Sequence, residues 1–285
     1  MLTIHRNLFR QVTIVGVGLI GGSLGKAIKK HRLAREVIGV SQKQETLDAA
    51  LKAGAIDQGI LDIKKAVVNA DLVILATPVS VIVGMLSVLG KSLKRNCIVT
   101  DVGSTKASVV NVARDHFPSH VHFIGSHPLA GSEKSGVDYS REDLFENTLC
   151  IMTPTQATHR FALERVKALW TKVGAKVETL SPEEHDKALA FVSHLPHLLA
   201  YALMEAIPTD LTKYAGQGLK DTTRIAGSSP QMWGDICLGN SRNIVNALDE
   251  MTRNLSLLRK AVHNEDSKSL LNYFKSAKDK KEKLS

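Results

Sequence analysis

The first part of the chain alternates short apolar runs with longer amphipathic stretches. The apolar runs are rich in valine and isoleucine, and they predict buried strands at residues 11–15, 37–40, 72–76, 97–101, 121–125 and 149–153. The intervening stretches predict helices at residues 19–30, 43–53, 79–89 and 106–116, with a last helix and strand at residues 158–173 and 176–180. Strands that alternate with helices in this way are typical of a parallel, doubly wound α/β sheet.

The apolar spacing becomes purely helical in the last part of the chain. This part begins with Ser181-Pro182-Glu183-Glu184, which places serine at an N-cap, proline at the first helical position and glutamate where a capping box needs it. We predict a helix from there to about Ala206, kinked at Pro196. The sequence therefore divides into an α/β domain at residues 1–180 and a helical domain at residues 181–285.

Two further serines, Ser229 and Ser241, are predicted to cap the starts of later helices. In the last of these, apolar residues recur in alternating steps of four and three, at Ile244, Leu248, Met251, Leu255, Leu258 and Val262. A narrow apolar seam of this kind suits packing in a helical bundle or against another subunit.

A glycine-rich turn follows the first predicted strand and opens the first predicted helix. It matches the pattern G-x-G-x-x-G, with residues Gly16, Gly18, Leu19, Ile20 and Gly21 as its candidate contacts. Glycines at these positions let the backbone approach a pyrophosphate, which then lies at the positive end of a helix. The turn predicts a Rossmann-type dinucleotide-binding domain, and the alternative is a tight turn that binds no ligand.

The end of the second predicted strand bears on the choice of nucleotide. The acid that usually binds the ribose hydroxyls of NAD is absent there, and the residues present are Ser41, Gln42 and Lys43. A hydroxyl and a cation can accommodate a 2′-phosphate, which favours NADP over NAD. Lys43 could equally be a surface residue without a ligand.

Three predicted strands end in small polar loops, which contain Thr77-Pro78, Ser104 and His127. Because the carboxyl ends of parallel strands border the ligand crevice, we expect these residues to lie along one edge of the sheet. The ordinary pKa of histidine suits proton transfer near neutrality. As alternatives, Ser104 could cap the next helix and His127 could stabilise a turn.

Polar residues in the helical part could complete the site. Ser193 and His197 lie four residues apart and share a helix face. Arg224 precedes a flexible segment and could bind a carboxylate through two hydrogen bonds, or could instead pair with Asp221 or Asp235. A metal site is not predicted, because neither a carboxylate nor a cysteine accompanies the histidines at a suitable spacing.

Composition narrows the class of protein. The chain is 44% hydrophobic and 23% charged, as in ordinary globular proteins, and its three cysteines show no paired spacing. Residues 72–90 carry no charge, but Thr77-Pro78 divides them into a strand and a helix, so no membrane span is predicted. The net charge of +9 includes a lysine-rich end without nucleic-acid motifs, and it suits anionic ligands. We expect a cytoplasmic protein that does not bind nucleic acid.

Several motifs together resemble one family from about Val12 to the last helix. They are GVGLIGG (16–22), DVGSTK (101–106), HPLAGSEKSGV (127–137), LFENT (144–148), SHLPH (193–197) and GLKDTTRIAGSSPQMWGDI (218–236). In order and spacing they resemble the prephenate and arogenate dehydrogenases of tyrosine biosynthesis, and they are far more specific than the glycine pattern alone.

The resemblance implies an oxidative decarboxylation. Hydride leaves C4 of a cyclohexadienol for a nicotinamide, the C4 hydroxyl loses its proton, and carbon dioxide departs as the ring becomes aromatic. By this resemblance His127 accepts the hydroxyl proton, Ser104 contacts the same hydroxyl, and Arg224 binds the ring carboxylate. Ser193 and His197 contact the substrate side chain or the nicotinamide side of the cleft. Since aromatisation drives the reaction, no metal is expected.

The resemblance also implies a homodimer formed through the helical domain. We expect prephenate rather than arogenate as substrate, because His197 is present and no obvious acid is available to bind an ammonium group. Some relatives carry a regulatory domain, and because the sequence ends at Ser285 we expect no tyrosine feedback through such a domain. The alternatives are an arogenate dehydrogenase and a nucleotide-binding sensor without catalysis.

Overall fold

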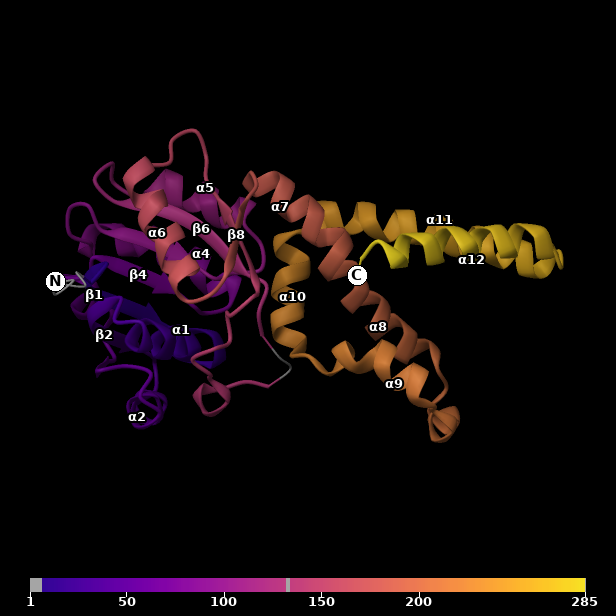
Figure 1. Cartoon of the computed structure of the whole chain (residues 1–285), viewed down its shortest axis with the longest axis horizontal. Helices are drawn as coiled ribbons and strands as arrows, with labels where there is room; N and C mark the ends of the chain where they lie inside the picture. Colours follow the sequence, from indigo (N-terminus) through magenta and orange to yellow (C-terminus); the bar gives the residue numbers. More distant parts are fainter. Residues whose placement is uncertain (1–6, 132–133, 285) are drawn as a thin grey trace, which may run out of the picture.

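A computed structural model describes residues 7–131 and 134–284, which form an α/β domain followed by a helical domain (Figure 1). The α/β domain is built on one eight-stranded sheet with the strand order β3-β2-β1-β4-β5-β6-β7-β8. The strands are β1 (Phe9–Val15), β2 (Ala34–Val40), β3 (Gln58–Ile60), β4 (Leu72–Leu75), β5 (Ile98–Asp101), β6 (His122–Pro128), β7 (Leu149–Thr153) and β8 (Lys176–Thr179).

The doubly wound sheet predicted from the sequence is confirmed, with one difference at its edge. Strands β1 to β6 pair in parallel, whereas β7 runs antiparallel to β6, and β8 then pairs in parallel with β7. A parallel return needs a long crossover, usually a helix. Among the described residues between Pro128 and Leu149, the only regular element is the 3₁₀ turn η2 (Val137–Tyr139), so the chain turns straight back.

Helices cover both faces of the sheet, namely α1 (Leu19–Lys30), α2 (Gln44–Lys52), α3 (Ile63–Val67), α4 (Val79–Leu89), α5 (Ala107–His116) and α6 (Arg160–Lys172). Alternate residues of each strand point to opposite faces. In β4, Leu72 and Ile74 pack with α1, α2 and α6, while Val73 and Leu75 pack with α3, α4 and α5. Burial on both faces explains why the strands read as continuous apolar runs.

The helical domain consists of α7 (Pro182–Leu189), the π-helical turn η3 (Ala190–His194), α8 (Leu195–Ala206), α9 (Gln217–Thr223), α10 (Pro230–Gly239), α11 (Ser241–His263) and α12 (Ser267–Glu282). The capping box at Ser181 is confirmed, since its hydroxyl accepts from the Glu184 backbone N–H at 3.2 Å. Where we predicted a kink at Pro196, the π turn interrupts the regular helix just before it. Ser229 caps α10 as predicted.

The predicted N-cap at Ser241 is wrong, because Ser241 is already the first residue of α11 and Asn240 holds the cap position. Among the described residues, the Asn240 side chain accepts no backbone N–H of the helix; its oxygen accepts the Asn243 side-chain amide at 2.8 Å, and its own amide donates to the carbonyl oxygen of Asp186, 2.7 Å away. The sequence therefore placed the start of this helix one residue too late, since asparagine and serine are comparable capping residues.

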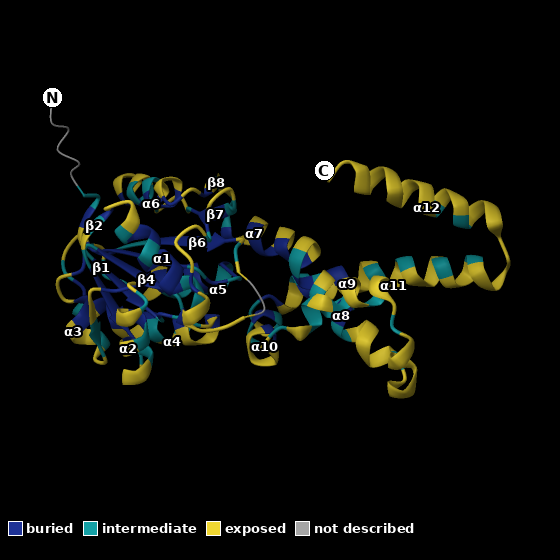
Figure 2. Ribbon diagram, turned by 60° about the horizontal axis from the view of Figure 1, so that its bottom comes forward, coloured by how far each residue is buried: buried dark blue, intermediate teal, exposed yellow. Residues whose placement is uncertain are grey.

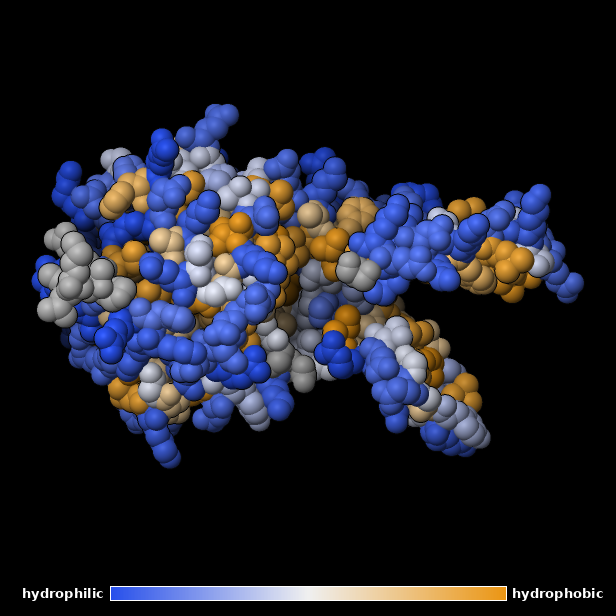
Figure 3. All heavy atoms as spheres, in the orientation of Figure 1, coloured by the Kyte–Doolittle hydropathy of each residue, from blue (hydrophilic) through white to orange (hydrophobic). Residues whose placement is uncertain are grey.

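Helices α11 and α12 extend away from the sheet as an antiparallel pair, and most of their surface is exposed (Figures 1 and 2). Exposed apolar residues of this pair include Leu255, Val262 and Phe274. Figure 3 shows hydrophobic atoms, in orange, towards the far end of the pair. No helix within the described residues is long and apolar enough to cross a membrane. The uncharged residues 72–90 form β4, α4 and the turn between them.

Candidate active site

The loops predicted to bind a nucleotide lie side by side at the carboxyl ends of neighbouring strands. Gly16 donates its backbone N–H to the carbonyl of Val40, the last residue of β2, at 2.9 Å. Ala76 donates to Val15 at 2.8 Å, which places the loop after β4 against the same turn. The glycine turn therefore lies between the loop that holds Ser41, Gln42 and Lys43 and the loop that holds Thr77 and Pro78.

Three glycines shape the turn in different ways. Gly16 has a φ of +92°, and a Cβ there would lie 2.5 Å from the carbonyl oxygen of Ala76. A Cβ on Gly21 would overlap the carbonyl oxygen of Gly16, so the helix and strand approach closely because this side chain is absent. At Gly18, in contrast, a Cβ would meet nothing within 4 Å, so the backbone borders open space.

The start of α1, formed by Leu19 and Ile20, fits an anionic ligand. Within the described part of the chain no side chain caps this helix end, and its first turn contains no acid. The first N–H groups of a helix lack internal partners and attract negative charge. Nearby, the buried hydroxyl of Thr77 has no hydrogen-bond partner among the residues that the structure describes. The described residues therefore fit the pyrophosphate of a dinucleotide.

Ser41, Gln42 and Lys43 directly follow β2, and the last two are exposed. The Ser41 hydroxyl accepts the backbone N–H of Lys43 at 3.3 Å, which bends the loop locally. No acid stands among these three residues, so the exposed ammonium of Lys43 is the charge that the loop offers to a ligand.

His127 lies inside a strand rather than in the loop that the sequence predicted. Strand β6 continues to Pro128, and His127 pairs across it with Ile151 of β7. Its side chain is almost fully buried. Burial is the main cause that lowers the pKa of His127 well below its ordinary value, and the charges of His185, Lys106 and His194 lower it further.

A chain of short contacts connects His127 to the first helix of the helical domain. Nδ1 of His127 lies 2.8 Å from Nε2 of His185, and Nδ1 of His185 lies 2.8 Å from Oδ1 of Asp186. The Asp186 carboxylate also accepts the backbone N–H groups of Lys106 at 2.7 Å and Ala107 at 2.9 Å. It thereby caps α5 from the other domain.

Our sequence reasoning missed His185 and Asp186. The available signal was a titratable pair directly after a capping box, in the first turns of an amphipathic helix. Both side chains face inward, and both are buried. Charged groups are seldom buried without a partner. A His-Asp pair on the apolar face of a helix therefore indicates a buried polar contact, once that face is known.

A buried ion pair holds the loop that contains Ser104. The Lys106 ammonium donates to the Asp101 carboxylate and, at 2.9 Å, to the carbonyl oxygen of Ser126. Asp101 accepts the backbone N–H of Gly103 at 2.9 Å as well. The loop is thus tied to the residue that precedes His127.

A pocket of about 490 Å³ lies between the two domains. It brings together His127 from β6, Ser193 from the π turn, His197 from α8 and Arg224, the first residue of the 3₁₀ turn η5 (Arg224–Gly227). Leu129, Ala130, Leu189, Val192, Ile225 and Trp233 are among the other described residues that line it. Ser104 is half-buried and does not belong to the described lining.

His197 is fixed by two neighbours in this pocket. Its ring stacks on Trp233 with 3.8 Å between centroids, and its Nδ1 lies 3.0 Å from the carbonyl oxygen of Ser193. A carbonyl only accepts, so Nδ1 carries the proton and Nε2 is left as the acceptor. Burial is the main cause that lowers the pKa of His197, and the charge of Arg224 adds to it. We had not predicted Trp233, although it stands in the same motif as Arg224.

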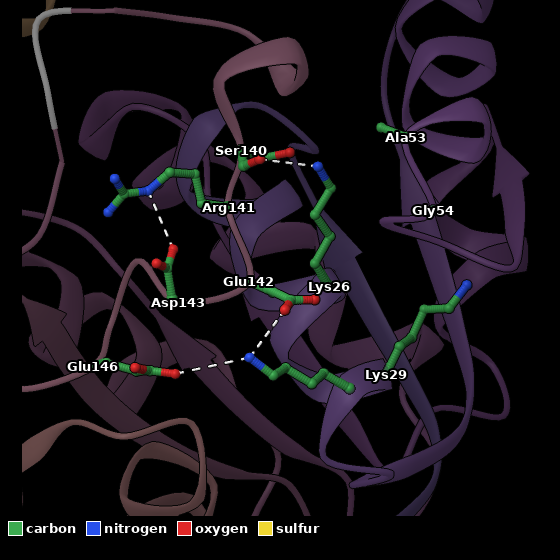
Figure 4. A pocket seen from close by; sticks show the side chains of 10 residues that line it. Lys26, Lys29, Ala53, Gly54, Ser140, Arg141, Glu142, Asp143 and Glu146 are labelled. Atoms are coloured by element: carbon green, nitrogen blue, oxygen red, sulfur yellow. Dashed lines mark hydrogen bonds and ion pairs between the residues drawn. The ribbon is translucent and has the colours of Figure 1, made fainter.

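A larger groove of about 770 Å³ lies elsewhere, between α1, α2 and residues 140–146 (Figure 4). Its charges largely satisfy one another: Lys30 pairs with Glu142 at 2.9 Å, and Lys26 donates to the carbonyl of Ser140 at 2.9 Å. None of the described residues that line the pocket of His127 lines this groove. We therefore place the candidate active site in the interdomain pocket.

Comparisons with known proteins agree with this arrangement. A model of the prephenate dehydrogenase nucleotide-binding domain matches residues 24–179, and a model of the prephenate dehydrogenase dimerization domain matches residues 181–276. A prephenate dehydrogenase of Bacillus subtilis (strain 168) is 41% identical over 280 residues, which cover 96% of this chain and 76% of the relative. A cyclohexadienyl dehydrogenase of Zymomonas mobilis is 34% identical and covers 94% of each chain.

Among solved structures, a prephenate dehydrogenase from A. aeolicus in complex with hydroxyphenyl propionate and NAD+ superposes with a TM-score of 0.90. It is 36% identical, and the match covers 97% of this chain and 98% of the other. Both family models, the identity over nearly the whole chain and the shared fold lead to one conclusion. This chain belongs to the prephenate dehydrogenase family.

Proposed function

We propose that this protein catalyses the NAD(P)-dependent oxidative decarboxylation of prephenate to 4-hydroxyphenylpyruvate. The observation that carries the proposal is the meeting of a neutral, buried histidine (His127) with an arginine (Arg224) in one pocket between the domains. The names of the relatives support the same reaction. A proton acceptor and a carboxylate-binding cation are the two groups that such a substrate requires.

In this reaction His127 is the base. Its Nδ1 faces His185, so Nε2 is the atom left to accept the proton of the ring hydroxyl. The family resemblance makes Ser104 the second contact to that hydroxyl; its loop is held near His127 by Lys106, although Ser104 lies outside the described lining of the pocket. A nicotinamide dinucleotide held at the glycine turn of Gly16, Gly18 and Gly21 would supply the acceptor for the hydride that leaves C4 of the ring.

Arg224 binds and orients the ring carboxylate, which leaves as carbon dioxide. Its guanidinium can hold a carboxylate by two parallel hydrogen bonds, which fixes the plane of that group. Ser193 and His197 contact the substrate side chain, since both line the pocket. The apolar lining residues exclude water from the ring.

A substrate and nucleotide matrix tests the proposal. We expect measurable kcat/KM for prephenate, and a much lower value for arogenate, because the described pocket lining contains no carboxylate to pair with an ammonium group. Reduced nucleotide is followed by its absorbance. If neither substrate reduces NAD or NADP, the enzyme assignment is wrong, and preference for arogenate would contradict the choice of substrate.

We further propose NADP as the preferred nucleotide. This proposal is supported by exposed Lys43 next to the Ser41 hydroxyl, and by the absence of an acid among the three residues after β2. In the same matrix, NADP is then expected to give the higher kcat/KM. Replacing Lys43 with alanine should lower the value for NADP and leave that for NAD unchanged, and equal values in the unmodified enzyme would contradict the proposal.

Gly18→Ala tests where the nucleotide binds. The new methyl group meets no described atom within 4 Å, but the ψ of −149° lies outside the region that alanine favours, so the melting temperature of the variant is measured beside its nucleotide affinity. If the pyrophosphate lies against this backbone, the methyl group raises the Kd of the nucleotide by about tenfold. Gly84→Ala is the matched control, because a Cβ there also meets nothing within 4 Å and the residue lies in α4. Equal nucleotide affinity in both variants would contradict the assignment.

We propose that the protein is a homodimer joined through its helical domain. The exposed apolar residues of α11 and α12, such as Leu255 and Phe274, would be covered by a second copy. The name of the matching family model supports this arrangement. Light scattering is expected to give twice the chain mass of 31.0 kDa, and a monomeric mass at micromolar concentration would contradict it.

A further inference from the structure

The contacts behind His127 form a path with a defined direction. From the pocket inward, the order is His127, His185 and Asp186, with 2.8 Å between the facing atoms at each of the two steps. The two histidines come from different domains, and all three side chains are nearly or fully buried. Because water has little access to this path, each member must find its hydrogen-bond partner within it.

An ionised carboxylate accepts hydrogen bonds and has none to donate. Asp186 therefore requires the proton of His185 to be on Nδ1, which leaves Nε2 of His185 as an acceptor. That acceptor in turn requires the proton of His127 to be on Nδ1. The remaining nitrogen of His127, Nε2, is then bare and faces the pocket.

We propose that His185 and Asp186 are positioning residues that hold His127 in the one tautomer able to act as a base. This inference rests on the proposed function, in which the bare Nε2 takes the hydroxyl proton. As the O–H bond breaks, the new N–H bond forms at Nε2, and the positive charge on the ring is balanced by Asp186 through His185. Neither residue touches the substrate.

Asp186 is itself held from several sides, so the path is rigid. Its two carboxylate oxygens accept the N–H groups of Lys106 and Ala107 at the start of α5. Its own carbonyl accepts the Asn240 amide at 2.7 Å. These backbone donors fix the orientation of the Asp186 carboxylate, with Oδ1 directed at Nδ1 of His185.

Two substitutions of His185 separate positioning from simple structural support. His185→Leu removes the acceptor for Nδ1–H of His127, whereas His185→Gln can present an amide oxygen near the position of Nε2. Asp186 is a poorer target because it also caps α5. We expect His185→Leu to lower kcat by about 10²-fold with little change in the KM of the nucleotide, and His185→Gln to recover to within about tenfold of the unmodified enzyme.

Nitrogen NMR of the ¹⁵N-histidine-labelled protein at neutral pH reports the tautomer directly. A spectrum of His127→Asn assigns the His127 signals. In the unmodified protein and in His185→Gln, we expect the proton on Nδ1, and in His185→Leu a mixture of both tautomers. His122→Leu is the matched control, because it also removes a histidine ring that contacts β6 or belongs to it. The His122 ring lies in β6 and stacks on His159 with 4.1 Å between centroids.

The outcomes distinguish this inference from the proposed function. Suppose that the unmodified protein turns over no substrate, but the tautomer of His127 differs between it and the His185→Leu variant. The proposed function then fails and the positioning role stands. If His185→Leu keeps both its kcat and the Nδ1–H tautomer, the positioning role is wrong. An equal loss of kcat in His185→Leu and His122→Leu would also overturn it, because such a loss would reflect general damage to β6.

Discussion

Replacing His127 with asparagine is expected to lower kcat by about 10³-fold and to leave nucleotide affinity unchanged. An asparagine amide can occupy the position of Nδ1 and keep a hydrogen bond to His185, but it has no group in the position of Nε2. The variant therefore loses the base while it keeps the buried contact of 2.8 Å. Single-turnover absorbance gives the rate, and calorimetry with the nucleotide gives the affinity.

Two results would contradict this role for His127. A comparable loss of nucleotide affinity would indicate a histidine that supports the fold rather than the reaction. Nucleotide binding without turnover in the unmodified protein would favour the sensor that the sequence left open. The helix content of the variant, measured by circular dichroism, serves as the control for folding.

The pH profile provides an independent check on the same residue. Burial, together with His185, Lys106 and His194, lowers the pKa of His127 well below 6.5, so the base is neutral at pH 7. We expect kcat/KM to stay level near neutrality and to fall only as the pH drops through this lowered pKa. An unfolded histidine takes up a proton more readily, so folding stability is also lost below 6.5. Unfolding is therefore monitored at each pH.

Replacing Arg224 with alanine is expected to lower kcat/KM for the substrate by about 10²-fold. The loss appears mainly in KM if the guanidinium binds the carboxylate equally before and during the reaction, and in kcat if it also aligns the carboxylate for departure. Arg224→Lys is expected to lie between the two, because an ammonium group cannot form two parallel hydrogen bonds. Steady-state kinetics with the substrate varied at saturating nucleotide measures all three enzymes.

Arg114→Ala is the matched control for Arg224, since Arg114 is an exposed arginine of α5 that pairs with neighbouring Asp115. It should leave kcat/KM unchanged. If Arg224→Ala and Arg114→Ala behaved alike, Arg224 would have no part in binding the substrate, and the interdomain pocket would need another cation for the carboxylate.

The α/β domain was largely predictable because its order is local. Helices α1 and α4 begin and end at the predicted residues, and β7 spans the predicted range. The short β3 (Gln58–Ile60) and α3 (Ile63–Val67) were missed, because three and five residues are too few to show a period. The reversal of β7 was also missed, since the direction of a strand depends on pairing and leaves no mark in its own apolar pattern.

The sequence predicted four residues that line one pocket, whereas Ser104 lies outside its described lining, and the sequence did not predict the buried partners of His127. His127, Ser193, His197 and Arg224 share a pocket, although almost a hundred residues separate the first from the last. His185 could not be foreseen as a neighbour of His127, because their contact depends on how one domain docks on the other. That geometry comes from packing, and no spacing within either segment encodes it.

The π-helical turn at Ala190–His194 joins α7 to α8 and sets how far α8 is rotated about the helix axis relative to α7. His185 of α7 faces His127, and His197 of α8 faces the interdomain pocket. Each residue of an α-helix advances about 100° around the axis, so excising one residue from the turn would swing α8 by that angle. Helix α7 would keep its orientation. The extra residue of the π turn therefore allows His185 to face His127 while His197 faces the pocket.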